Sequence, residues 1–332
     1  MPDRSQSTPS ISCVMPAYNE SMGLTAVVER VLAALAALSP QVEIIIVNDG
    51  SRDDTGAVAR RLCQAHPEVR LLDLSRNFGK ESALTAGLEA AQGDVVVMMD
   101  ADGQHPESLL PEMLEKWRQG SDVVYAVRQS REDQSALHKR LVGMFYKLVN
   151  LGNQVQIPAG AGDFRLLDRQ VVAALNALPE RHRFMKGLYA WVGFPATAIN
   201  YEPLEREGGE SSFGLRGAFR LGVTGLLAFS SAPLRVVGLL GLLLSVLALG
   251  YGGWVVIEYF WWGINVPGYA TLVVGMMLLS GVQLVSIGLL AEYVARIYDE
   301  VKQRPNYLVA ARVGQGLDAA KAYSAAEGPT DA

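Results

Sequence analysis

The first third of the chain alternates between short apolar runs and longer stretches whose apolar residues recur every three or four positions. Period-four spacing is typical of amphipathic helices, and short β-branched runs are typical of buried strands. The predicted strands are 11–15, 42–47, 69–74, 94–99 and 123–127. The predicted helices are 21–38, 53–65, 80–91 and 107–119. This order predicts βαβ units in an α/β domain with a mostly parallel sheet.

Polar motifs follow three of these predicted strands. They are Asn48-Asp49-Gly50-Ser51, Ser75-Arg76-Asn77 and Asp100-Ala101-Asp102. In open α/β sheets, ligands bind at the carboxyl ends of the parallel strands. We therefore expect the three motifs to meet in one cleft.

The pattern changes after residue 232. Residues 236–257 and 259–291 contain no charged side chain, and Asn265, Pro267 and Gly268 restrict the second apolar stretch to about 269–291. A helix needs about 20 apolar residues to cross a bilayer. Two buried core helices are the alternative, but core helices rarely stay free of charge over this length. The pattern predicts a two-helix transmembrane hairpin.

The distribution of cations indicates how this hairpin is oriented. Lys and Arg are absent from the loop between the spans but occur on both flanks, at Arg216, Arg220, Arg235, Arg296, Lys302 and Arg304. The positive-inside rule then places both chain ends in the cytosol. Residues 1–10 lack the apolar core of a signal peptide. We expect an integral protein of the inner or plasma membrane whose large domain and both termini are cytosolic.

Residues 213–229 mix apolar side chains with Arg216 and Arg220. This pattern fits interfacial helices on the membrane surface, and it fits equally an amphipathic helix packed on the domain. The expected division is a disordered N-terminus at 1–10, the α/β domain at 11–210, interfacial helices at 211–232 and the hairpin at 233–295. A largely disordered cytosolic tail follows at 296–332.

Composition excludes several classes of protein. The net charge is −5 and the pI is about 5.5, which argues against nucleic acid as a partner. The chain has two cysteines, so it has neither a disulfide framework nor a Cys/His zinc pattern.

The two carboxylates of Asp100-Ala101-Asp102 suit a hard divalent cation. Mg²⁺ and Mn²⁺ prefer oxygen ligands and are often held by one or two carboxylates together with substrate phosphates. The same residues also suit a polar turn. Asp49 can accept hydrogen bonds from a nucleotide base, while the alternative for its segment is a strand-to-helix turn that caps the next helix.

Several segments together carry a resemblance to a known family. They are 14–20, 47–51, 74–81, 99–106, 162–169, 183–193 and 230–235. In order and spacing they resemble family 2 glycosyltransferases, and more narrowly the polyisoprenyl-phosphate glycosyltransferases. The resemblance covers residues 11–305. It implies a GT-A domain followed by interfacial helices and the transmembrane hairpin.

The resemblance also implies a reaction. The enzyme would transfer a hexose from a nucleotide-sugar, best guessed as UDP-glucose, to a polyisoprenyl phosphate on the cytosolic membrane face with inversion. GDP-mannose, UDP-galactose and UDP-N-acetylglucosamine are alternative donors. A processive polysaccharide synthase is disfavoured because the chain lacks a Gln-x-x-Arg-Trp motif. A non-catalytic membrane protein that keeps a nucleotide-binding fold is the rival from another class.

Site residues follow from the same resemblance. The donor would be bound by Pro16, Tyr18, Glu20, Asp49, Lys80 and Asp100. Mg²⁺ or Mn²⁺ would be held by Asp100, Asp102 and Gln104. Asp163 would position or deprotonate the acceptor, or only cap or pair with Arg165, and Arg206 would close over the diphosphate. Arg128, Lys139 and Arg140 would face the lipid phosphate, unless they are solvated surface charges. Glycines in the first span permit close helix packing, so a homo-oligomer is expected.

Overall fold

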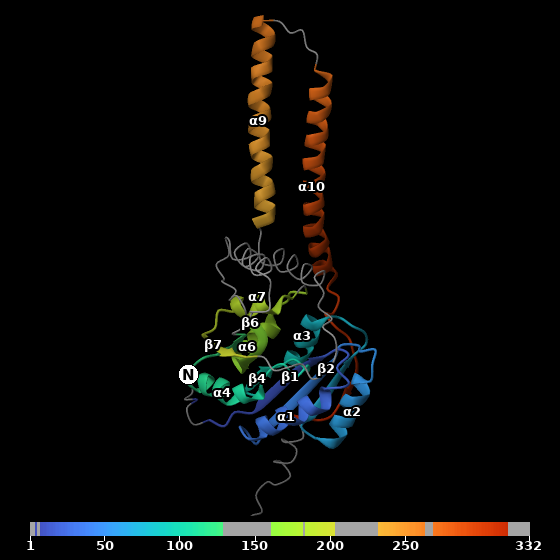
Figure 1. Ribbon diagram of the computed structural model, residues 1–332, viewed down its shortest axis with the longest axis vertical. Coiled ribbons are helices and arrows are strands. Elements are labelled where there is room, and N and C mark those ends of the chain that lie inside the picture. The colour runs from blue at the N-terminus through green and yellow to red at the C-terminus, as the bar shows by residue number, and fades with distance from the viewer. Residues whose placement is uncertain are drawn as a thin grey trace, which may run out of the picture.

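The computed structural model describes residues 4, 7–128, 161–181, 183–202, 232–262 and 268–317. It consists of an α/β domain from one end of which two long helices project (Figure 1). The α/β fold class and the mostly parallel sheet expected from the sequence are both confirmed.

The sheet of the described residues runs in the order β7-β5-β6-β4-β1-β2-β3-β8. The strands are β1 (Ile11–Ala17), β2 (Val42–Asn48), β3 (Val69–Leu74), β4 (Val95–Met98), β5 (Val123–Arg128), β6 (Ala161–Asp168), β7 (Ala196–Tyr201) and β8 (Val309–Val313). β1 pairs in parallel with β2 and β4, and β2 with β3. β6 runs antiparallel between β4 and β5. The sequence pattern predicts the first five strands and indicates none of the last three.

Helices cover both faces of the sheet. α1 (Leu24–Ala36), α2 (Thr55–Ala65) and α4 (Leu110–Arg118) contribute to one apolar core, and a short 3-10 turn (Glu107–Leu109) precedes α4. α3 (Lys80–Ala90), α6 (Arg169–Ala177) and α7 (Met185–Trp191) contribute to the other. Every residue of β2 is buried, as expected for a parallel strand covered on both faces. Because both faces of the sheet are covered, we expect a ligand to bind at the carboxyl ends of the strands.

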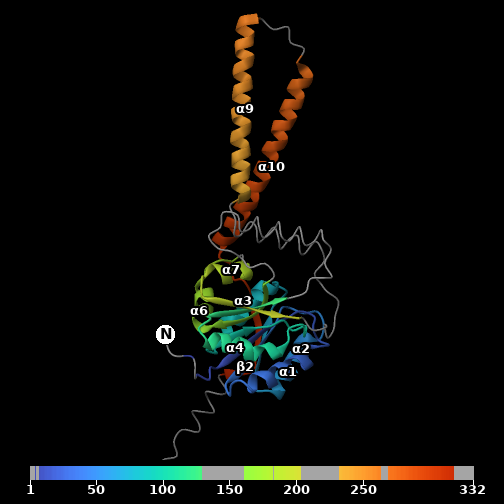
Figure 2. The same cartoon turned by 60° about the vertical axis from the view of Figure 1, so that its left-hand side comes forward.

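The two projecting helices are α9 (Ala232–Trp262) and α10 (Tyr269–Lys302). At 1.5 Å per residue they are about 46 and 51 Å long, more than the roughly 30 Å of a bilayer core. By length and composition they contain two candidate membrane spans, Val237–Val255 and Val274–Lys302. Figure 2 shows both helices extending away from the domain.

The chain after α10 returns to the domain. The expectation of a largely disordered tail from residue 296 is wrong as far as residue 317, because α10 continues to Lys302 and β8 then pairs antiparallel with β3 and forms the edge of the sheet. The Ser75 N–H donates to the Leu308 carbonyl at 2.9 Å, and the Tyr307 hydroxyl donates to Glu89 at 2.6 Å. Leu317 is buried. Residues 318–332 lie outside the described part of the chain.

Deleting residues 303–332 should expose the β3 edge and lower the melting temperature of the purified protein. An unpaired edge strand presents free N–H and C=O groups that promote aggregation. Thermal melting and size-exclusion chromatography in detergent would measure both effects. Deletion of 318–332 alone is the matched control and should change neither; equal effects of the two deletions would contradict the structural role of β8.

Candidate functional site

The loops that follow β1 and β2 are hydrogen-bonded to each other. The Asn19 N–H donates to the Ser51 hydroxyl at 3.0 Å, and the Asn19 side-chain oxygen accepts from the Arg52 N–H at 2.8 Å. The Glu20 N–H donates to the Thr55 hydroxyl at 2.9 Å. The half-buried Tyr18 therefore lies in a loop whose conformation is fixed by hydrogen bonds to the loop after β2.

Asp49 joins the β2 loop to the loop after β3. Its carboxylate accepts hydrogen bonds from the Phe78 N–H at 2.7 Å and the Gly79 N–H at 2.9 Å. Gly50 has a φ of +60°, and a Cβ there would lie 2.3 Å from the Arg76 carbonyl carbon. Burial raises the pKa of Asp49 above its ordinary value, against these two hydrogen bonds and the Arg76 charge. The turn thus needs both the acid and the glycine.

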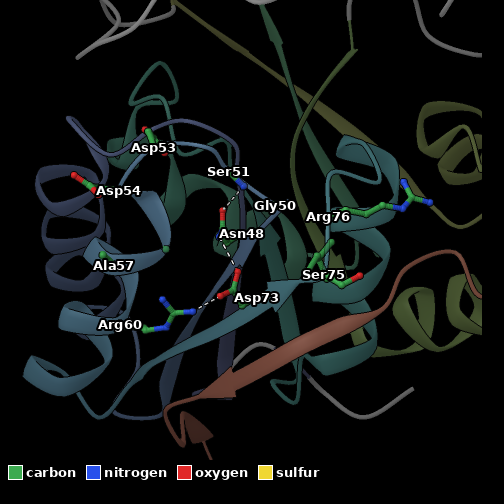
Figure 3. Close-up of a pocket in the computed structure, with 12 residues that line it drawn as sticks. Asn48, Gly50, Ser51, Asp53, Asp54, Ala57, Arg60, Asp73, Ser75 and Arg76 are labelled. Carbon is green, nitrogen blue, oxygen red and sulfur yellow. Dashed lines mark hydrogen bonds and ion pairs between the residues drawn. The ribbon is translucent and has the colours of Figure 1, made fainter.

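A pocket of about 400 Å³ lies between the ends of β2 and β3 and the start of α2 (Figure 3). Asn48 spans it: its side-chain amide donates to Asp73 at 2.7 Å, and its side-chain oxygen accepts from the Ser51 N–H at 3.3 Å. Arg60 pairs with the same Asp73 carboxylate. Both polar groups of the Asn48 side chain are therefore used to stabilise the loop after β2.

The acid motif after β4 meets β6 across the sheet. β4 and β6 pair antiparallel with Met98 opposite Arg165, and the same register continued by two residues sets Asp100 opposite Asp163. Two carboxylates this close repel each other. Lys80, the first residue of α3, lies between them, with its ammonium 2.6 Å from Asp100 and 2.8 Å from Asp163. One cation thus holds three elements together.

The protonation states follow from this arrangement. Burial alone would raise the pKa of Asp163, but the charges of Lys80 and Lys186 outweigh it and hold that pKa well below its ordinary value. Burial opposes the charged form of Lys80, yet the two facing carboxylates raise its pKa above its usual range. Both groups are therefore charged at neutral pH.

His105 is hydrogen-bonded to the backbone of the acid motif Asp100-Ala101-Asp102. Its Nδ1 accepts a hydrogen bond from the Asp100 N–H at 3.0 Å, and its ring stacks on Phe164 with centroids 4.8 Å apart. Tyr201 approaches the same two rings edge-on. Burial lowers the pKa of His105, which suits an acceptor nitrogen. The ring links the β4 loop to β6 next to Asp163.

Glu81 follows Lys80 and reaches α7. Its carboxylate accepts a hydrogen bond from the Met185 N–H, the first residue of α7, at 3.0 Å. Burial raises the pKa of Glu81 to about 7, and the charge of Asp163 adds to the increase. Glu81 thus ties the start of α3 to the start of α7.

The donor set at the acid motif fits a divalent cation that is shared with a ligand. Asp102 accepts from the Gln104 N–H at 3.1 Å, and both aspartates are partly exposed. Among the described residues no group of three or more His, Cys, Asp or Glu side chains could hold a metal by itself. A cation at these oxygens therefore needs further ligands from water or a bound phosphate.

The structure brings most of the predicted site residues to one edge of the sheet. They lie on β1, on β6, at the first residue of α3 or in the loops after β1, β2 and β4: Pro16, Tyr18, Glu20, Asp49, Lys80, Asp100, Asp102, Gln104 and Asp163. Arg128 ends β5 opposite Tyr201 and is exposed. Lys139, Arg140 and Arg206 fall outside the described residues.

Three residues around this edge carry no assignment from the sequence: Glu81, His105 and Lys186. His105 stands in the quoted motif beside Gln104, which could have drawn attention to it. Glu81 and Lys186 also lie in segments that carry the resemblance, 74–81 and 183–193. As charged residues near helix starts, however, they resemble ordinary surface charges.

Comparison with known proteins gives the class. The chain matches the model for glycosyl transferase family 2 over residues 12–175 and the model for the GtrB C-terminal hairpin over residues 232–297. The protein is a glycosyltransferase with a GT-A domain, and it belongs to family 2.

The similarities to two sequence relatives extend over nearly the whole chain. An uncharacterized glycosyltransferase of Synechocystis sp. is 43% identical over 91% of this chain and 95% of its own length. The SfII prophage-derived bactoprenol glucosyl transferase of Shigella flexneri is 41% identical over 90% of this chain and 97% of its own length. Glucosyl-3-phosphoglycerate synthase from Mycobacterium tuberculosis, solved with Mn²⁺, uridine-diphosphate and phosphoglyceric acid, is 20% identical with a TM-score of 0.48, covering 68% of this chain and 78% of that one.

Replacing Asn48 with Asp should destabilise the domain by about 1–3 kcal/mol at pH 7, because it sets a second carboxylate against Asp73. Repulsion raises the pKa of one of the two acids in the folded state. The loss relative to wild type should therefore be small below pH 4 and grow as the pH rises. Melting temperatures of both proteins across this range would measure it. The double variant N48D/D73N should recover most of the loss; no recovery would contradict the assigned contact.

Replacing Glu81 with Gln should flatten the pH dependence of stability. The folded pKa of about 7 lies above the ordinary value of 4.5 for a glutamic acid, so the wild-type protein loses stability as the pH rises through this window. The shift corresponds to at most about 3 kcal/mol. Glutamine can still accept from the Met185 N–H, so the variant isolates the charge. The melting temperatures of wild type and E81Q would be measured between pH 4.5 and 7.5. If they change with pH in the same way, the raised pKa of the buried Glu81 is contradicted.

Proposed function

We propose that this protein transfers a hexose from a nucleotide-sugar, with UDP-glucose first among the donors, to a polyisoprenyl phosphate at the cytosolic membrane face. The observation that carries the proposal is the meeting of Asp100, Asp163 and Lys80 at one sheet edge, in a chain that also contains two candidate membrane spans. A relative named as a bactoprenol glucosyl transferase, 41% identical over most of both chains, supports this acceptor.

The donor would lie along the loops after β1, β2 and β4. Tyr18, Glu20 and Asp49 would border the nucleoside, and Lys80 and Asp100 the diphosphate. Asp102, with Asp100 and Gln104, would hold Mg²⁺ or Mn²⁺, which supplies charge neutralisation for the departing diphosphate. Lys80 already faces this position and can donate to a phosphate oxygen as readily as to a carboxylate.

The acceptor needs little activation. The second pKa of a phosphate monoester is about 6, so the lipid phosphate is largely a dianion at neutral pH. One of its oxygens would attack the anomeric carbon while the bond to the diphosphate breaks, and the nucleoside diphosphate would leave with the electron pair. Asp163, which is charged and paired with Lys80, would help to position the acceptor through that ammonium rather than take up a proton. A direct displacement converts an α-linked donor into a β-linked lipid product.

The hairpin would hold the catalytic domain at the membrane surface. The charge-free stretches of α9 and α10 would span the bilayer, and the cations that flank them would keep the catalytic domain and both termini in the cytosol. The phosphate of a polyisoprenyl lipid lies at the headgroup level, on the side where the domain would sit.

A donor panel tests the reaction directly. Purified full-length protein should transfer label from UDP-glucose to undecaprenyl phosphate, lose this activity on chelation, and regain it with Mg²⁺ or Mn²⁺. GDP-mannose, UDP-galactose and UDP-N-acetylglucosamine are the competing donors. A non-catalytic membrane protein would yield no labelled lipid with any of them.

Replacing Asp102 with Ala should lower the transfer rate by at least about 100-fold, because one ligand of the proposed cation is lost. Its melting temperature should stay close to wild type, since Asp102 is a partly exposed loop residue. Transfer assays at saturating donor and acceptor would measure the change. Glu29, an exposed acid on α1 that is not among the predicted site residues or the pocket lining, gives the control variant E29A, which should transfer normally. Wild-type rates in D102A would overturn the cation assignment.

A further inference from the structure

The short helix α7 lies at the end of the domain that faces the hairpin in both views (Figures 1 and 2). Trp191, its last residue, is 53% exposed although it is a large aromatic side chain. Exposed tryptophan is favoured at a membrane–water interface. A lipid headgroup that approaches the domain from the bilayer would therefore meet α7.

The segment before α7 is attached to the base of α10. The Arg181 N–H donates to the Glu300 carboxylate at 2.8 Å, and the Arg181 guanidinium donates to the Arg304 carbonyl. At its other end, the Met185 N–H donates to Glu81. The segment is thus held by the membrane anchor on one side and by the start of α3, beside Lys80, on the other.

Lys186, the second residue of α7, directly follows Met185, whose N–H is bound to Glu81 next to the Lys80 that pairs with Asp163. Burial raises the pKa of both Asp163 and Glu81, and the Lys186 ammonium counteracts that rise at both carboxylates. Yet among the described residues no carboxylate lies within ion-pairing distance of Lys186. Its side chain is partly exposed.

The other cations near Asp163 are already engaged. Lys80 is paired with Asp100 and Asp163. Arg165 is buried, with its guanidinium 4.3 Å from the centre of the Tyr189 ring and its Nε donating to the Gly162 carbonyl. A second anion brought up to Asp163 is repelled by that carboxylate, so it needs a cation that can still form new hydrogen bonds. Lys186 meets this requirement.

We propose that Lys186 binds the phosphate of the lipid acceptor and that α7 forms the membrane-side wall of the acceptor site. This inference rests on the proposed function. It adds to the predicted acceptor residues a cation on α7, a helix whose start is bound to Glu81 and whose preceding segment is bound to the base of α10.

The test is a steady-state comparison of full-length wild type, K186M, K186R and the control K116M in nanodiscs. Lys116 lies on α4, in the other apolar layer of the domain, and is also partly exposed. K186M should raise the apparent KM for undecaprenyl phosphate about tenfold or more, as expected for loss of a charge-assisted contact, with the KM for the donor unchanged. K186R should recover most of the loss, and K116M should behave as wild type.

Other outcomes overturn the inference. A lower kcat with an unchanged lipid KM would mean that Lys186 acts only through Asp163. A rise in the KM of donor and lipid alike would assign it to the donor. Melting temperature and UDP affinity serve as folding controls for K186M.

Binding separates this inference from the proposed function. Thermophoresis with a short-chain polyprenyl phosphate should show binding to wild type and at least about tenfold weaker binding to K186M. Wild type that binds the lipid phosphate but transfers no sugar from any donor would overturn the proposed function. K186M that binds as tightly as wild type would overturn the inference alone.

Discussion

The candidate site depends on one electrostatic constraint, the neutralisation of two facing carboxylates by a single ammonium. β4 and β6 pair antiparallel up to Met98 opposite Arg165, and beyond that pair Lys80 lies within 3 Å of both Asp100 and Asp163. Without a cation the two acids would repel each other or share a proton. The start of α3, the β4 loop and β6 are therefore held in one arrangement by charge, and the site is formed before any ligand binds.

The loops next to this centre are organised in a related way, by polar side chains that bind backbone rather than solvent. Asp49 accepts two N–H groups of the loop after β3, and Asn48 bridges Asp73 and Ser51. Because these hydrogen bonds already order the loops, ligand binding costs little further conformational entropy. Pre-organisation of this kind is what transition-state stabilisation requires.

Much of the domain could be predicted from the sequence because its central strands are strongly apolar. The run Val42 to Val47 is buried on both faces, so its pattern is unambiguous. The strands β6 and β8 escaped prediction because charged residues such as Asp163, Arg165 and Arg312 interrupt them. At the site, the acid motif after β4 was visible, whereas the roles of Asn48 and Glu81 were not. Their partners, Asp73 and Met185, are distant in sequence and are brought near only by the fold.

The unbroken course of α10 has a further consequence. The helix runs from its apolar span to Lys302 without interruption, contacts the domain through Glu300, and continues into the sheet as β8. In the proposed membrane arrangement, it sets the distance between the bilayer and the candidate site. Each residue added to its charged end would raise the domain by about 1.5 Å and turn it by about 100° around the helix axis. The length of this segment thus sets both the height and the facing of the cleft above the membrane.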